Sequence, residues 1–322
     1  MSQGFETRGA MNRIGPALQD NIRRVILGKD EAIDLALCAL MARGHLLIED
    51  VPGVGKTFLA RALARSLNAV FKRVQFTPDL LPSDITGVSI YNAQTTAFEF
   101  RPGPVFAHVL LADELNRATP RTQSALLECM GEAQVSVDGQ TRRLPDPFFV
   151  VATQNPIEQQ GVYNLPEAQL DRFVAKIRVG YPHPTVEAAI LEQQRDHHPL
   201  DDLKPVARVE DVLAAQREVR AVYVARELGE YIVRLVDATR QHPDLALGAS
   251  PRASLALYRL SQARAWLEAS DFVLPDTIKQ MAPAALRHRL ILKPQSRLAG
   301  RTADAVIDDI LRTIPPPVER KG

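Results

Sequence analysis

This chain of 322 residues has few cysteines, no imbalance of charge and no long apolar run. Its two cysteines, Cys38 and Cys129, lie far apart and each falls within a helical pattern. We therefore expect neither a disulfide framework nor a cysteine metal cluster, and the seven histidines show no metal-ligand spacing. No apolar run is long enough to span a bilayer, and residues 1–12 lack the apolar core of a signal peptide. These absences predict a cytoplasmic protein with no membrane insertion.

The charge and composition are those of an ordinary globular protein. The net charge is +1, which gives no whole-molecule field to favour nucleic acid or an anionic membrane. Hydrophobic residues make up 46% of the chain and charged residues 24%, and the length suggests two domains.

The most informative stretch is an apolar segment at 45–49, a loop containing Gly53 and Gly55, and a helical segment from Lys56. This is the context of a phosphate-binding loop, in which backbone N–H groups at a helix N-terminus face an anion. Lys56 is expected to reach the β- and γ-phosphates, and the Thr57 hydroxyl to hold Mg²⁺. Asp50 stands where such loops usually begin with glycine, and a turn that contains the motif by chance is the alternative. The residues expected to bind the nucleotide are Asp50, Pro52, Gly53, Val54, Gly55, Lys56, Thr57, Phe58 and Gly28.

Polar side chains follow two further apolar runs. The run at 109–112 ends in Asp113 and Glu114, and the run at 148–152 is followed by Asn155. Ligands of open α/β sheets bind beyond the carboxyl ends of the strands, so these side chains are expected beside the phosphate loop. Asp113 would support Mg²⁺ through its water shell, Glu114 would activate or orient the attacking water, and Asn155 would position water or sense the γ-phosphate. The simpler alternatives are an acidic turn for the two acids and a turn before proline for Asn155.

Two arginines in the second half of the chain are further candidates. Arg172 lies on a short helix expected at 165–173, where it is either a salt-bridge partner or, in a ring ATPase, a group that enters the neighbour's site. Arg252 follows Ser250 and Pro251 and so falls in the first turn of a helix. A cation there is unfavourable for the helix dipole, which suggests a bound anion nearby; plain solvent exposure is the alternative.

The organisation of the chain follows from the change of pattern at residues 181–184, after a fifth strand at 175–179. Before this point strands and helices alternate, and two β-hairpins are expected at about 87–100 and 135–143. Beyond it helical periodicity dominates, with helices expected near 185–196, 209–222, 226–241, 251–268, 275–291 and 302–312. We expect a disordered start (1–12), a nucleotide-binding domain (13–180), an all-helical domain (181–314) and a flexible tail (315–322).

These pieces together resemble the MoxR family of AAA+ ATPases over residues 14–312. The stretches that carry the resemblance are 49–57, 113–117, 122–128, 152–156 and 161–173, with Asn164 where proline is more usual. The resemblance implies an α/β fold: an AAA+ P-loop module, that is, a parallel five-stranded αβα sandwich with β-hairpin insertions, followed by an all-helical lid domain. It also implies roles for the candidate residues, namely Lys56 and Thr57 as Walker A, Asp113 and Glu114 as Walker B, Asn155 as sensor 1, Arg172 as arginine finger and Arg252 as sensor 2.

The resemblance further implies Mg²⁺-dependent hydrolysis of ATP in a hexameric ring, with chaperone-like remodelling or maturation of client protein complexes and a von Willebrand factor A domain partner. Three alternatives remain at this point: the ATPase subunit of a metal chelatase, a nucleic-acid motor, and a nucleotide-gated scaffold. The tips of the two hairpins, 92–96 and 137–140, contain no basic or aromatic group for a nucleic acid. The sequence does not indicate the client, or whether Arg252 acts on its own subunit's nucleotide.

Overall fold

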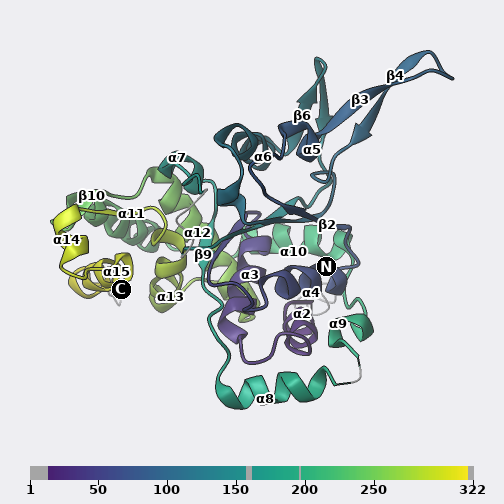
Figure 1. Cartoon of the computed structure of the whole chain (residues 1–322). Coiled ribbons are helices and arrows are strands. Elements are labelled where there is room, and N and C mark those ends of the chain that lie inside the picture. The colour runs from purple at the N-terminus through teal and green to yellow at the C-terminus, as the bar shows by residue number, and fades with distance from the viewer. Residues whose placement is uncertain (1–13, 157–161, 196, 318–322) are drawn as a thin grey trace, which may run out of the picture.

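The computed structural model describes residues 14–156, 162–195 and 197–317. The predicted disordered start therefore lies outside the described residues, as does most of the predicted tail; residues 315–317 form neither helix nor strand. An α/β domain carries a helical lid beside one edge of its sheet, and two hairpins project from the opposite side of the domain (Figure 1). In the described ranges, no helix combines the length and the apolar character needed to cross a membrane.

The centre of the α/β domain is a parallel five-stranded sheet in the order β2-β5-β8-β1-β9. Its strands are β1 (Leu46–Glu49), β2 (Phe71–Gln75), β5 (Val109–Asp113), β8 (Phe149–Gln154) and β9 (Ala175–Ile177). The inner strands are continuous apolar runs because helices cover both faces of the sheet. This arrangement confirms the predicted five-stranded αβα sandwich.

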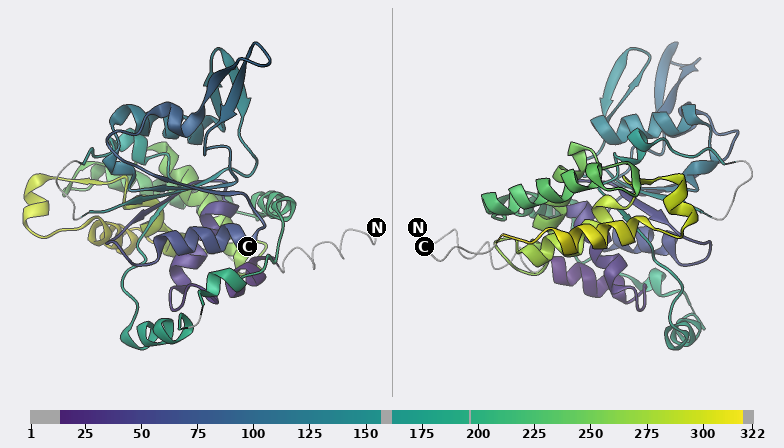
Figure 2. Two further views of the ribbon diagram at one scale, coloured as in Figure 1. Left: turned by 45° about the vertical axis from the view of Figure 1, so that its right-hand side comes forward. Right: turned by 90° about the vertical axis from the view of Figure 1, so that its left-hand side faces the viewer.

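Alternation along each strand divides the core into two layers. Leu46 and Ile48 of β1 face a large cluster that includes α2 (Ile14–Arg23), α3 (Asp30–Met41) and α4 (Lys56–Ser66). Leu47 faces the other cluster, to which α5 (Pro82–Thr86) and α6 (Pro120–Glu132) contribute. Figure 2 shows the sheet between these two layers.

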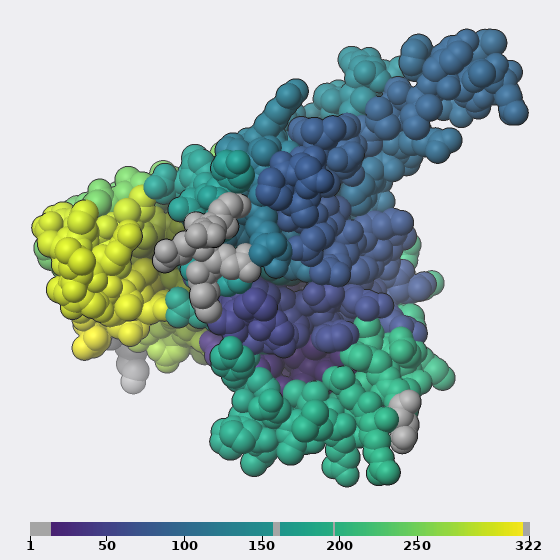
Figure 3. All heavy atoms as spheres, viewed as in Figure 1, coloured from purple at the N-terminus to yellow at the C-terminus, as the bar shows by residue number. Residues whose placement is uncertain are grey.

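Both predicted hairpins are present. One pairs β3 (Gly87–Asn92) with β4 (Ala97–Pro102), and the other pairs β6 (Gln134–Val137) with β7 (Gln140–Arg143). They touch where the Arg142 guanidinium lies 4.2 Å from the centre of the Phe100 ring. The β3–β4 hairpin stands clear of the body in the space-filling view (Figure 3).

Two aromatic residues of the β3–β4 hairpin, Tyr91 and Phe98, are exposed, and their rings contact each other edge to face. They flank the turn at 92–96, which itself contains no aromatic residue.

The lid region is mostly helical, as predicted. Its helices are α8 (Pro184–Gln193), α9 (Pro199–Asp202), α10 (Val209–Ala221), α11 (Arg226–Gln241), α12 (Pro251–Leu267), α13 (Pro275–Leu286), α14 (Pro294–Leu298) and α15 (Ala303–Thr313). Helix α13 packs against the edge strand β9, and α12 and α10 pack against α3. The predicted domain boundaries at 180/181 and 314/315 remain predictions.

The lid is not made of helices alone. The helix expected over 275–291 ends at Leu286, and residues 291–292 form a short strand, β11 (Ile291–Leu292), that pairs antiparallel with β10 (Leu245–Leu247). The prediction of helix over 287–291 was wrong, because the strand that pairs with residues 291–292 lies far away in the sequence.

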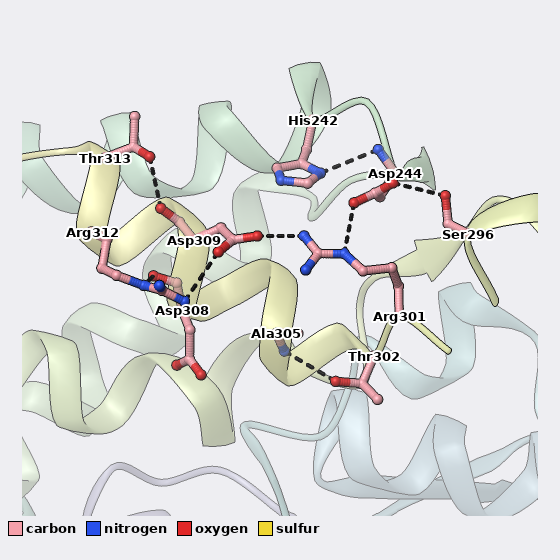
Figure 4. Close-up of polar contacts among 10 residues, drawn as sticks. All are labelled: His242, Asp244, Ser296, Arg301, Thr302, Ala305, Asp308, Asp309, Arg312 and Thr313. Atoms are coloured by element: carbon pink, nitrogen blue, oxygen red, sulfur yellow. Dashed lines mark hydrogen bonds and ion pairs between the residues drawn. The ribbon is translucent and has the colours of Figure 1, made fainter. Parts of the chain in front are cut away.

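Arg301 links the residue just before β10 to α15. It bridges Asp244, whose carboxylate also accepts from Ser296, to Asp309 (Figure 4). The hydrogen bonds from Ser296 and Arg301 hold the pKa of Asp244 below its usual value, which favours the ionised carboxylate that these contacts need.

Candidate functional site

The loop at 50–55 has the backbone of an anion site. Gly53 and Gly55 have φ of +85° and +89°, a region that L side chains rarely adopt, and a Cβ added to either would meet nothing within 4 Å. The glycines are therefore needed for their dihedral angles. Gly55 precedes the first residue of α4 and cannot cap it with a side chain. Open space thus lies at an uncapped helix N-terminus, and the Lys56 ammonium reaches back to the Asp50 carbonyl at 2.7 Å.

The contacts of Asp50 explain why an aspartate stands where such loops usually begin with glycine. Its carboxylate accepts from the backbone N–H groups of Val51 (2.8 Å), Val179 (2.7 Å) and Gly180 (2.5 Å). The side chain thereby ties the start of the loop to the segment that follows β9. Nucleotide contact by Asp50 stays a prediction, whereas its role in anchoring the loop is visible in the structure.

The other predicted nucleotide-binding residues surround this loop. Gly28 turns the chain between α2 and α3 with φ of +64°, and the neighbouring Lys29 donates to the Tyr181 carbonyl at 2.7 Å, one residue beyond the anchor of Asp50. Pro52 is exposed and Val54 is partly buried against the core. Phe58 stacks on His198 with ring centres 4.4 Å apart.

The two acids lie at the carboxyl end of β5, as predicted. Asp113 is only 8% exposed. One of its oxygens accepts from the Thr153 hydroxyl at 2.6 Å, and the other from Arg73 at 2.7 Å. The same hydroxyl accepts the Glu114 N–H at 2.9 Å, so Thr153 fixes both acids from the neighbouring strand.

The Glu114 carboxylate is held from two sides. Gln75, at the end of β2, donates to it at 2.6 Å, and Arg117 lies 3.1 Å from the same oxygen. The backbone of Glu114 is left-handed, with φ of +56°. That conformation turns the chain sharply at the strand end, where Glu114 is next to Asp113 yet has different partners.

Asn155 also arrives at this edge. It is 5% exposed and follows Gln154, whose carbonyl accepts the Asp50 N–H at 3.2 Å. The segment that carries Asn155 and the loop at 50–55 are thus joined by the pairing of β8 with β1. Residues 157–161 lie outside the described residues, and Gly161 among them begins the last stretch that carries the family resemblance.

The donors at this edge fit a metal that arrives with a nucleotide. Across the described ranges, no group of three or more His, Cys, Asp or Glu side chains is arranged to hold a metal ion. Mg²⁺ keeps several waters and takes one or two protein ligands plus phosphate oxygens. Thr57 in the first turn of α4 and Asp113 at the end of β5 are suitable for that arrangement.

Arg172 lies at the other end of the strands, where their amino ends are. It precedes β9, which runs parallel to β1, and the N–H of Val174 donates to the carbonyl of His45, just before β1. The Arg172 guanidinium donates to the Leu127 carbonyl in α6. It passes so close to Gly131 that a Cβ there would lie 2.7 Å from Nη1.

Arg252 shares a pocket with Arg172. The Ser250 hydroxyl caps α12 by accepting the Arg252 N–H at 3.1 Å, so Arg252 is in the first turn, as predicted. The pocket has a volume of about 500 Å³. Its lining includes five arginines and two acids, namely Arg43, Arg172, Arg252, Arg259, Arg289, Glu132 and Asp171.

The structure therefore sorts the predicted residues into two groups. The phosphate loop, the two acids and Asn155 meet where the carboxyl ends of the strands lie, which we call the carboxyl edge of the sheet. Arg172 and Arg252 meet where the amino ends of the strands lie, which we call the amino edge. Sequence reasoning did not find Thr153, Arg73 or Gln75 at the first group. Their only signal in the sequence is a polar residue at or near a strand end, which is common on protein surfaces.

The comparisons with known proteins agree with this geometry. Residues 45–175 match the ATPase family associated with various cellular activities (AAA), and residues 237–310 match the AAA lid domain. The uncharacterized protein YeaC of Bacillus subtilis is 53% identical over 96% of both chains. Chaperone MoxR1 of Mycobacterium tuberculosis is 42% identical over 91% of this chain and 80% of its own. The crystal structure of a protein from Cytophaga hutchinsonii assigned as an ATPase superimposes with a TM-score of 0.91 at 38% identity, covering 97% of this chain and 98% of that one.

The chelatase alternative is not favoured. The magnesium-chelatase 38 kDa subunit of Acidiphilium rubrum is 31% identical, and the match covers only 62% of this chain and 59% of that subunit. The match to MoxR1 covers both domains at higher identity. AAA+ proteins bind a nucleotide together with a divalent metal, which is what the carboxyl edge of the sheet fits. The chain belongs to the MoxR family of AAA+ ATPases.

Proposed function

We propose that this protein hydrolyses ATP with Mg²⁺ at composite sites, each built from the carboxyl edge of one subunit and the amino edge of the next. The observation that carries the proposal is the separation of Lys56 and Glu114 from Arg172 and Arg252. β1 has four residues, which at about 3.3 Å per residue corresponds to roughly 13 Å between the two edges. An arginine finger must touch the γ-phosphate, so the two groups serve different nucleotides.

The carboxyl edge would perform the chemical step. Water attacks the γ-phosphorus in line, the bond to the β–γ bridging oxygen breaks, and ADP leaves with that oxygen. Glu114 orients the water and takes its proton, and Asn155 holds the water on the attack line. Lys56 would offset the charge on the phosphates. Thr57 and Asp113 would hold the metal, which would supply further charge compensation there.

The amino edge would complete the site of the neighbouring subunit. Phosphoryl transfer is catalysed mostly by positioning and charge stabilisation, and an arginine finger contributes about 10³–10⁵ in rate. Arg172 and Arg252 line one pocket on the same side of the chain, which supports action of both residues in trans. A contact of this kind is heterologous and closes into a ring; the family resemblance points to six subunits.

Mixed rings test the composite site. Arg172→Ala and Glu114→Gln subunits, co-expressed with different tags and purified through both, are each expected to be inactive alone. In a random equal mixture about one interface in four joins an intact Glu114 to an intact Arg172, so activity should return to about a quarter of the wild-type rate. A mixed ring that remains as inactive as the two single variants would contradict the proposal.

We also propose that the ring remodels client protein complexes, with a von Willebrand factor A domain protein as partner. The name of the relative MoxR1, a chaperone, supports a protein client. Stimulation of the ATPase by a purified domain of that kind tests the partner. A pure nucleotide-gated scaffold would instead bind ATP without turnover, and a nucleic-acid motor would give a salt-dependent shift of labelled DNA.

A further inference from the structure

We propose that Asp171 and Arg289 form a positioning pair that holds the two trans-acting arginines, Arg172 and Arg252, as one rigid unit. This inference rests on the proposed function, because it assigns a role to groups beside the two arginines. The pair joins the nucleotide-binding domain to the lid, where α12 and α13 lie beside β9 (Figure 1).

Arg289 forms hydrogen bonds with the backbone on both sides of Arg172. Its side chain is 3% exposed and its Nε donates to an Asp171 oxygen at 2.7 Å. Its Nη2 donates to the carbonyls of Asp171 (3.1 Å) and Phe173 (2.6 Å). One planar guanidinium, from the segment just after α13, therefore fixes the residue before and the residue after the arginine finger, which a point-charge lysine could not reproduce.

The second oxygen of Asp171 holds the start of α12. It accepts from the Ser250 hydroxyl at 2.7 Å, and the same hydroxyl accepts the Arg252 N–H at 3.1 Å. A short chain of hydrogen bonds thus runs from Arg289 through Asp171 and Ser250 to the turn that carries Arg252. A shift of the lid would move both arginines together.

The pair also prevents an ion pair between Asp171 and Arg172, which would compete with a phosphate for the Arg172 guanidinium. Asp171 is the carboxylate next to Arg172 in the chain and would be a natural ion-pair partner for it. Both of its oxygens are occupied by Arg289 and Ser250 instead, while Arg172 donates to the Leu127 carbonyl. Burial lowers the pKa of Arg289, and the hydrogen bond to Asp171 opposes that shift. A buried guanidinium needs such a partner.

An ion pair elsewhere in the interface between lid and core provides a matched control. Arg264 of α12 lies 2.7 Å from Asp34 of α3, with side chains 16% and 14% exposed. It anchors the lid without touching either trans-acting arginine. We expect Asp171→Asn and Asp34→Asn to lower stability comparably and to leave ATP binding intact. Only Asp171→Asn should lower kcat, by about 10- to 100-fold, the loss typical of misplaced catalytic groups.

The first test places Asp171→Asn in tagged mixed rings with Glu114→Gln. Activity should return, because the Asp171→Asn subunit keeps an intact phosphate loop and receives the intact arginines of its neighbour. Equal kcat for Asp171→Asn and Asp34→Asn would overturn the inference. So would mixed rings that stay inactive with Asp171→Asn but recover with Arg172→Ala.

The second test needs no mixed rings and so separates this inference from the proposed function. Ser250→Ala should lower kcat in the wild-type background and have no further effect on kcat in an Arg252→Ala background, because Ser250 acts through Arg252. Ser250→Thr, which keeps the hydroxyl, should restore kcat. Independent losses in the double variant would refute the coupling, even if rings of Arg172→Ala and Glu114→Gln behave as proposed. Failure of those rings with coupled losses would contradict only the trans arrangement.

Discussion

Lys56 and Arg172 lie at opposite ends of two neighbouring parallel strands. Lys56 comes after β1 at the carboxyl edge of the sheet, and Arg172 comes before β9 at the amino edge. Parallel pairing makes this separation unavoidable, because the chain must return to the amino edge before each new strand. One subunit thus presents a phosphate loop on one side and two arginines on the other.

Replacing Glu114 should separate ATP binding from turnover. Glu114→Gln keeps the size of the side chain and can still bond to Gln75, but it cannot take a proton from water. We expect hydrolysis to fall by at least about 10²-fold, with ATP retained on the protein after gel filtration. Glu31→Gln, an exposed change in the first turn of α3, is the control. Wild-type hydrolysis by Glu114→Gln would disprove the role given to Glu114.

Asp50 should matter for the fold and the nucleotide together. Asp50→Ala leaves the buried N–H of Val179 and the partly buried N–H of Gly180 without their acceptor, at a cost of about 1–3 kcal/mol in the free energy of unfolding. The loop loses its anchor, so affinity for ATP should fall as well. Asp50→Asn keeps one acceptor oxygen and should be milder. Urea unfolding and a nucleotide titration measure the two effects, and wild-type behaviour of Asp50→Ala in both would show that the anchor is unimportant.

Gly131 lets Arg172 lie along α6. In Gly131→Ala the new Cβ would stand 2.7 Å from Arg172 Nη1, so the flexible end of the arginine must move. Stability should not fall, since alanine favours a helix over glycine by about 1 kcal/mol. The ATPase rate should fall by up to about 10²-fold, the effect of misplacing a catalytic group by an ångström. An unchanged rate in a stable Gly131→Ala ring would mean that the finger does not need this position.

Two buried histidines should make the protein less stable in mild acid. His45 accepts the Val150 N–H through Nδ1 (3.1 Å), so Nε2 carries the proton given to the Met130 carbonyl. Burial lowers the pKa of His45 to about 4, and burial also lowers the pKa of His288. Both stay neutral when folded, whereas the unfolded chain takes up protons below about pH 6.5.

The stabilising contribution of each histidine is therefore present above pH 6.5 and falls as the pH drops below that value; for His45 the fall continues to about pH 4. The expected loss between pH 6.5 and 5 is roughly 2 kcal/mol for His45, and His288 adds a loss in the same direction. Urea unfolding at pH 7 and pH 5 checks this prediction. Equal or greater stability at pH 5 would show that the two rings are not held neutral.

Features that depend on a few neighbouring residues could be predicted from the sequence. The phosphate loop and the buried strands are of this kind, because strand, loop and helix signals lie side by side in the chain. Asp113, Glu114 and Asn155 were expected at one edge from a topological rule alone, and the structure places them there.

Features set by distant partners could not be predicted. Arg289 and Asp171 are 118 residues apart, and neither stands out in its own segment. Whether Arg252 faces its own nucleotide depends on how the lid packs beside β9, which no local pattern encodes. The strand at 291–292 was missed for the same reason, since it exists only through pairing with β10.

The specific ATPase activity across a wide range of protein concentration, with the molar mass measured by light scattering in the same samples, tests the central claim most directly. The account predicts that activity per mole rises with concentration in step with assembly, and that Arg172→Ala assembles without this rise. Full activity per mole at dilutions where the protein is monomeric would contradict a site completed by the neighbouring subunit.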